Sequence, residues 1–240
     1  KNIKSFIEFY NSMQITTSMT TKSRLAQKES RNLSFKKNNS NLKDASKFSK
    51  LTQLQDEIKK LDCNLKDIAT NLVFSDGNNN SEIMFIGEAP GAEEDRIGKP
   101  FKGEAGKLLD KMLGFIDLDR DRNFYISNIL YWRPPGNRTP NLREIAICLP
   151  SVKKHIHIIK PKILILLGGV ACKTLLNTKE GITKLRGKKL KYHDEQNQLE
   201  IDTRVLFHPA YLLRNPIEKK RVWNDLLEIS DFITEKKIKV

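Results

Sequence analysis

Three short polar motifs in the sequence carry side chains that could do chemistry. Residues 87–91 read GEAPG, Asn128 follows a short apolar run, and His208 is followed by Pro209. They offer a carboxylate, an amide and an imidazole, groups that can read a polar ligand and stabilise charge. Singly, each motif is more often structural, and GEAPG lacks the glycine spacing of a dinucleotide site. What they can do together depends on the elements that position them.

All three motifs directly follow apolar runs that favour buried strands. The predicted strands cover residues 83–86, 124–127, 163–167 and 204–207. Apolar spacing and helix-start signals predict helices over residues 51–61, over 104–114, over 141–159 with a bend or break at Pro150, after Gly168 and Gly169, and from Asn215 onward. This alternation predicts the α/β class, as a three-layer α/β/α sandwich around a central four-stranded, mainly parallel sheet. Parallel strands end at one edge of a sheet, so the three motifs should meet there.

Composition sets the domain organisation and the kind of partner. The chain has 240 residues and a net charge of +14, and residues 1–50 hold 11 Lys and Arg against 3 Asp and Glu. We predict a basic, largely flexible extension over residues 1–50, with a short helix over 3–13 and a linker over 16–50, and a single folded domain over 51–235. The charge favours a polyanionic partner, although an AT-rich genome alone can inflate the lysine content. No apolar run reaches the roughly 18 residues of a membrane span.

The segments around the three motifs resemble family 4, or type-4, uracil-DNA glycosylases. Residues 87–113 resemble the first family motif, residues 128–140 (NILYWRPPGNRTP) the middle segment, and residues 208–214 (HPAYLLR) the final motif. The resemblance implies a hydrolase acting on N-glycosyl bonds, which flips uracil out of DNA, cleaves its glycosidic bond and leaves an abasic site for base excision repair. It also implies uracil-containing DNA and downstream repair proteins as partners. We further expect a monomer without membrane contact, located in a bacterial cytoplasm with its nucleoid.

The resemblance assigns roles to residues of the three motifs. Asn128 is expected to accept from uracil N3–H and donate to O4, a pattern that cytosine would reverse. His208 should donate to O2, where negative charge grows as the base leaves. Glu88 should stabilise the oxocarbenium-like sugar or position water, with Asn137 and Glu94 joining it in a hydrogen-bond network. The expected catalytic residues are Glu88, Asn137 and His208, and the expected base-binding residues are Ala89, Phe101 and Asn128.

The expected DNA contacts lie in the middle and final motifs. Arg133, Arg138 and Arg214 are candidates for phosphate contacts. Among Tyr211, Leu212 and Leu213, one apolar side chain is a candidate wedge for the space that the flipped base vacates, with Leu212 as the assigned residue. The alternative for both leucines is ordinary core packing. The expected DNA-binding residues are therefore Arg133, Arg138, Leu212 and Arg214.

The cysteines depart from the pattern of many family members, which hold a [4Fe-4S] cluster with four cysteines. Cys63 and Cys148 match the second and fourth ligand positions, whereas Lys60 and Trp132 occupy the first and third. Cys172 matches no ligand position. The sequence therefore predicts no metal site and no cofactor, with Trp132 and the Lys60 stem partly filling the gap beside two reduced thiols.

Other functions remain open at this stage. A DNA-binding protein without catalysis would keep the fold, and a glycosylase of broader specificity would keep the site. A relative that attaches covalently to DNA through a loop histidine is excluded, because residues 133–141 contain no histidine. The missing cluster ligands disfavour an iron–sulfur redox or structural protein.

Overall fold

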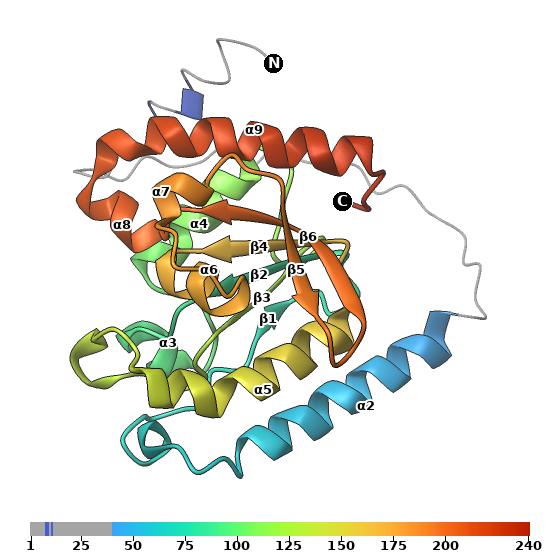
Figure 1. The fold of residues 1–240 in the computed structure, drawn as a ribbon, viewed down its shortest axis with the longest axis vertical. Coiled ribbons are helices and arrows are strands. Elements are labelled where there is room, and N and C mark those ends of the chain that lie inside the picture. The colour runs from blue at the N-terminus through green and yellow to red at the C-terminus, as the bar shows by residue number, and fades with distance from the viewer. Residues whose placement is uncertain (1–7, 10, 12–39) are drawn as a thin grey trace, which may run out of the picture.

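The computed structural model describes residues 8, 9, 11 and 40–240, which are built around one six-stranded sheet (Figure 1). The strands are β1 (Asp76–Gly77), β2 (Ile83–Gly87), β3 (Tyr125–Asn128), β4 (Ile163–Leu167), β5 (Leu190–Asp194) and β6 (Leu199–Leu206). They lie in the order β1-β3-β2-β4-β6-β5. The four central strands pair in parallel, and β1 and β5 add an antiparallel strand at either edge. The predicted parallel core is confirmed, and the sheet has two strands more than expected.

Helices connect the strands much as the apolar spacing predicts. The described helices are α2 (Ser40–Ile58), η1 (Asn64–Asp67), α3 (Ala92–Ile97), α4 (Glu104–Gly114), η2 (Pro135–Asn137), α5 (Leu142–Ile159), α6 (Gly169–Leu175), α7 (Ile182–Leu185), α8 (Pro209–Arg214), η3 (Pro216–Glu218) and α9 (Lys219–Glu235). The predicted break at Pro150 is wrong, because α5 runs through it. Pro150 and Ala146 are both exposed, so water can satisfy the carbonyl that loses its helical partner.

Alternate side chains of the central strands pack into two separate cores. Ile83 and Phe85 of β2 pack with the apolar faces of α4 and α9. Met84 and Ile86 of the same strand pack with α2, α5 and α6. Helices therefore cover both faces of the sheet, which confirms the three-layer α/β/α sandwich (Figure 1).

The predicted boundary at residue 50 is wrong, because α2 begins at Ser40 and residues 40–50 are helical. The Lys47 ammonium donates to the carbonyls of Asn79 and Ile159, which ties the polar first half of α2 to the domain. Near the N-terminus, residues 8, 9 and 11 are helical and the buried Phe9 ring lies 4.7 Å from the Trp223 ring. The remainder of the predicted 3–13 helix, and residues 16–39 of the predicted linker, lie outside the described residues. Across the described chain, no helix combines the length and apolar character needed to cross a membrane.

Candidate active site

The three motifs meet, as predicted, around one cavity of about 430 Å³ at the carboxyl edge of the parallel strands. β2 ends at Gly87, β3 ends at Asn128, and His208 follows β6. Of the predicted site residues, the cavity wall contains Glu88, Ala89, Phe101, Asn128, Asn137, Arg138, His208 and Arg214. Arg133 and Leu212 do not line it.

Asn128 presents an unsatisfied acceptor to this cavity. Its side chain is 2% exposed, and its Oδ1 atom has no hydrogen-bond partner among the described residues. A buried polar atom without a partner costs stability, so such an atom in a cavity wall indicates a bound partner. Gly87 lies beside Asn128 in the β2–β3 register, and a Cβ on Gly87 would lie 2.5 Å from Oδ1. The amide therefore depends on the glycine for its place.

Phe101 supplies an aromatic wall from an unusual backbone conformation. Its side chain is 6% exposed, its ring centroid lies 5.7 Å from that of His208, and its φ of 55° is left-handed. The chain comes close to α4 here, since a Cβ on Gly106 would lie 1.8 Å from the Phe101 carbonyl oxygen. On the other side, a Cβ on Gly87 would lie 2.4 Å from Phe101 Cζ. Two glycines thus make room for this one residue.

His208 is held as a neutral hydrogen-bond donor. Burial, with the nearby Arg214 charge, lowers the pKa of His208 to about 4. Its Nδ1 atom accepts the Ala210 amide hydrogen at 3.2 Å and so caps α8. In a neutral ring the single proton must then sit on Nε2. His208 can donate from Nε2 without carrying a charge.

Two carboxylates line the cavity, and they differ in how many hydrogen bonds they accept. Burial raises the pKa of Glu88, whose carboxylate forms no hydrogen bond with the described residues. Glu94 accepts three backbone amides, from Gly91 at 3.1 Å, Lys102 at 2.8 Å and Gly103 at 2.7 Å. Glu94 therefore joins the GEAPG segment to the loop that carries Phe101. Glu88 is the carboxylate left free for a substrate or water.

The predicted hydrogen-bond network of Asn137 is wrong. Within the described part of the chain, no hydrogen bond joins Asn137 to Glu88 or Glu94. Asn137 instead lies exposed with a left-handed φ of 56°, and its Oδ1 accepts from Arg133 Nε at 2.7 Å. The η2 turn displaces Asn137 toward the rim, where Arg133 reaches it along the same loop.

The arginines differ in how free their charges are. Arg138 donates two hydrogen bonds to the buried Glu144 carboxylate, at 2.5 and 3.0 Å. That pairing weakens its case as a phosphate contact, because its charge is already offset. Arg214 is exposed at the cavity and has no carboxylate partner among the described residues.

The assignment of Leu212 as a DNA wedge is wrong. Its side chain is fully buried in the core between α4 and α9, whereas the neighbouring Leu213 is 40% exposed. The helical phase of α8 turns successive side chains to different sides, so only one of the two leucines can face the solvent.

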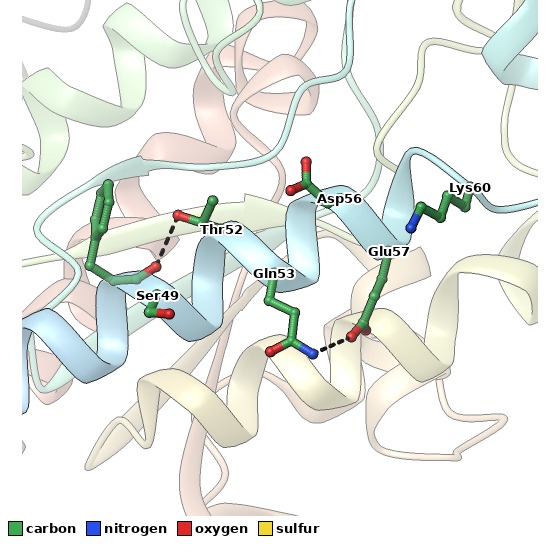
Figure 2. A pocket seen from close by; sticks show the side chains of 7 residues that line it. Ser49, Thr52, Gln53, Asp56, Glu57 and Lys60 are labelled. Carbon is green, nitrogen blue, oxygen red and sulfur yellow. Dashed lines mark hydrogen bonds between the residues drawn. The ribbon is translucent and has the colours of Figure 1, made fainter.

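The residues at the positions that match the family's cluster ligands do not fit an iron–sulfur cluster. Cys63, Cys148 and Trp132 are all buried in one apolar cluster, and burial with the neighbouring Cys63 thiol raises the pKa of Cys148 to about 12. The expectation that the Lys60 stem fills the gap is wrong, because Lys60 is exposed in the turn that follows the C-terminal end of α2 (Figure 2). Among the described residues, no three His, Cys, Asp or Glu side chains gather as metal ligands would. Two thiols cannot replace four thiolates.

Some lining residues were not predicted from the sequence. They are Pro90, Gly91, Ala105, Pro134, Thr139 and Ala210. All lie within the three motif segments, so the segment boundaries were the only available signal. Their individual orientations depend on the folded loops.

Comparisons with known proteins agree with this geometry. A family model described as the Uracil DNA glycosylase superfamily matches residues 74–227. A Type-4 uracil-DNA glycosylase of Sulfurisphaera tokodaii is 40% identical over 73% of this chain and 81% of the relative. Relatives with the same name from Archaeoglobus fulgidus and Thermotoga maritima are 35% and 37% identical, over 72% and 71% of this chain and 88% of each relative. The chain belongs to the uracil-DNA glycosylase superfamily and, within it, to the type-4 family.

Proposed function

We propose that the chain is a uracil-DNA glycosylase, a hydrolase that releases uracil from DNA and leaves an abasic site. The observation that carries this proposal is the buried, unpartnered Oδ1 of Asn128 in a cavity walled by Phe101 and lined by His208. Family membership supplies the reaction class, and the cavity supplies a matching donor and acceptor pattern.

Asn128 gives the site its preference for uracil. Its free Oδ1 accepts from uracil N3–H, and its amide nitrogen donates to O4. Cytosine presents the reverse pattern and would leave buried polar atoms mispaired, which costs roughly 1–3 kcal/mol. The flipped base stacks on the Phe101 ring.

His208 and Glu88 act on the two halves of the breaking bond. As the bond between uracil N1 and sugar C1′ breaks, both electrons leave with the base and negative charge grows on O2. The Nε2 proton of neutral His208 stabilises that charge. The Glu88 carboxylate stabilises the cationic sugar and takes a proton from the water that adds to C1′, a role that its raised pKa favours. Asn137 assists at the rim, where its amide nitrogen remains available to water.

The rim of the cavity binds the DNA backbone and holds the duplex open. Arg214 and Arg133 contact phosphates, with Arg138 contributing less because of Glu144. Leu213 takes the wedge role in place of Leu212, since it is the exposed leucine of α8. We propose that the enzyme acts in a bacterial cytoplasm, at the nucleoid. We propose a monomer that passes its abasic product to downstream repair proteins.

The enzyme works without an iron–sulfur cluster. Two observations support this: Trp132 and Lys60 stand at two positions where the family has cysteine ligands, and the buried Cys148 thiol is protonated because its pKa is raised to about 12. An iron assay on protein purified without oxygen should find no stoichiometric iron. Iron near four atoms per chain would overturn this part of the proposal.

Uracil release tests the function directly. Single-turnover reactions should release uracil from an oligonucleotide with one deoxyuridine, and Glu88→Ala and His208→Ala should each slow release by about 100-fold or more. Oligonucleotides with cytosine, mismatched thymine or hypoxanthine in the same position measure the range of bases. Binding of uracil-containing DNA without release would instead indicate a non-catalytic relative.

A further inference from the structure

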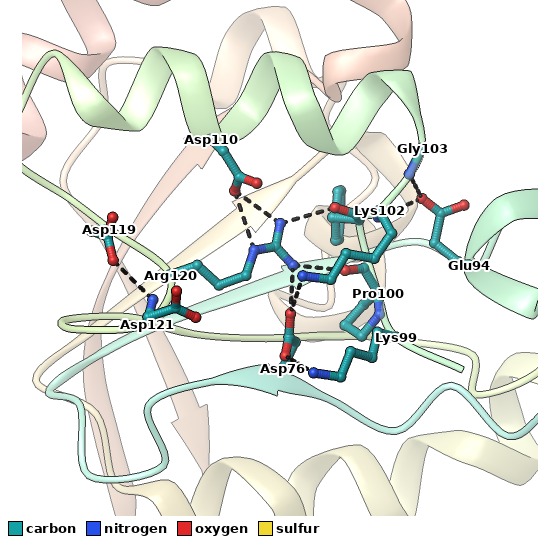
Figure 3. A network of polar contacts seen from close by, with 11 residues as sticks. Asp76, Glu94, Lys99, Pro100, Lys102, Gly103, Asp110, Asp119, Arg120 and Asp121 are labelled. Carbon is teal, nitrogen blue, oxygen red and sulfur yellow. Dashed lines mark hydrogen bonds and ion pairs between the residues drawn. The ribbon is translucent and has the colours of Figure 1, made fainter. Parts of the chain in front are cut away.

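The loop that carries Phe101 is held by a buried arginine from a distant part of the sequence. Arg120 precedes β3 and is 7% exposed. Its guanidinium donates to the carbonyls of Pro100 at 2.8 Å and Phe101 at 2.9 Å (Figure 3). The backbone that sets the aromatic wall is thus fixed by a side chain outside the cavity.

The guanidinium is fully occupied in this position. Besides the two carbonyls, it donates to Asp110 Oδ1 from Nη2 at 2.8 Å and from Nε at 3.3 Å, and to Asp76 Oδ2 at 3.1 Å. These contacts use all five N–H donors of an arginine. Asp110 comes from α4 and Asp76 from β1, so these two elements and the loop with Pro100 and Phe101 fix the orientation of Arg120.

A second set of contacts holds the other end of the same loop. Glu94 accepts the amides of Lys102 and Gly103, and the ammonium groups of Lys102 and Lys99 lie 2.7 and 3.2 Å from the Asp76 carboxylate (Figure 3). Carbonyls are therefore held on one side of Phe101 and amides on the other.

Phe101 needs such support because its backbone is strained. A left-handed conformation is unfavourable for a residue with a side chain, and it persists only where the surroundings impose it. The Phe101 carbonyl points toward Arg120 in this conformation and sits over Gly106. Relaxation of the backbone would turn the ring away from the cavity.

We propose that Arg120 is a positioning residue for uracil excision: its guanidinium, held between Asp110 and Asp76, binds the carbonyls of Pro100 and Phe101 and so fixes the stacking wall. This inference rests on the proposed function. Among the described residues that line the cavity, Arg120 hydrogen-bonds only to the backbone of Phe101, so its effect on the reaction must pass through that residue.

The test compares Arg120→Lys and Arg120→Met with a matched buried arginine. Arg204 is also 7% exposed, donates to the Thr203 carbonyl and lies 4.5 Å from the Phe232 ring, away from the cavity. Both Arg120 variants should slow single-turnover uracil release by about 10- to 100-fold and weaken inhibition by free uracil in parallel. Affinity for undamaged duplex should stay within about threefold. Arg204→Met should lower the melting temperature while its release rate, measured well below melting, stays within about threefold.

A double-variant cycle separates positioning from general stability. In a Phe101→Ala background, Arg120→Lys should slow release no further, because the wall that it positions is gone. If Arg120→Met does not fold, Asp110→Asn gives the same reading, since it removes the negative charge that strengthens two of the guanidinium contacts. Wild-type release rates in Arg120→Lys and Asp110→Asn, or full additivity with Phe101→Ala, would overturn the inference alone. A wild-type chain that releases no uracil would overturn the proposed function as well.

Discussion

Replacement of Gly87 by alanine tests how tightly the base pocket is built. The new methyl group would lie 2.4 Å from Phe101 Cζ and 2.5 Å from Asn128 Oδ1. Ordinary contact begins at 3.4 Å, so one or both groups must move by about 1 Å (3.4 − 2.4). Both side chains are buried, at 6% and 2% exposure, so neither can move freely.

The consequence should appear in the chemical step more than in folding. Overpacking of this kind costs about 1–3 kcal/mol of stability, and a 1 Å displacement of a positioning group costs about 100-fold in rate. We therefore expect Gly87→Ala to melt as a folded protein and to release uracil about 100-fold more slowly in single turnover. Gly114→Ala is the matched control, because nothing lies within 4 Å of its Cβ position. Equal rates for Gly87→Ala and wild type would refute the proposed placement of Phe101 and Asn128 around the base.

Two further predictions concern α8 and the response to acid. Leu213→Ala should slow uracil release from duplex DNA several-fold but not from single-stranded DNA. Leu212→Ala should instead lower the free energy of unfolding by about 2–5 kcal/mol. Release rates on the two kinds of DNA and urea unfolding measure these effects, and the opposite pattern would restore Leu212 as the wedge. Burial lowers the pKa of His155 from 6.5 to about 3, so the unfolded chain binds more protons than the native one below pH 6.5. The free energy of unfolding should therefore fall by about 2 kcal/mol between pH 7 and pH 5 from this group, and a pH-independent value would contradict it.

The central strands were predictable because burial on both faces leaves a continuous apolar run. Residues 163–167 read ILILL, and all five side chains are buried in β4. The edge strands gave no such signal. β1 has only two residues, and β5 alternates the exposed Lys191 and His193 with buried neighbours. Edge strands bury less apolar surface, so their sequences resemble loops.

The first half of α2 was missed for a related reason. Residues 40–50 read SNLKDASKFSK, which is too polar to indicate a buried face. Its position depends on contacts such as those of Lys47 with the distant carbonyls of Asn79 and Ile159. Tertiary contacts of this kind are invisible to helical periodicity.

The candidate site also has features that the sequence predicts and features that only the folded structure reveals. The common location of its central residues, Asn128 and His208, could be predicted because both follow predicted parallel strands. The contacts of Glu94 and Arg120 do not, because each joins segments whose approach is set by the folded loops. The choice between Leu212 and Leu213 required the phase of α8, which a six-residue helix after Pro209 does not reveal in sequence.

Uracil release by wild type and by Asn128→Asp, from one single-stranded and one duplex oligonucleotide, tests the central claim most directly. An ionised aspartate keeps the size of the side chain but cannot donate to uracil O4. We predict free uracil and an abasic site with wild type, and release slower by about 10- to 100-fold with Asn128→Asp, measured at a temperature where the variant is still folded. No uracil from wild type, or equal rates for the two proteins, would contradict the assignment of this cavity as a uracil pocket.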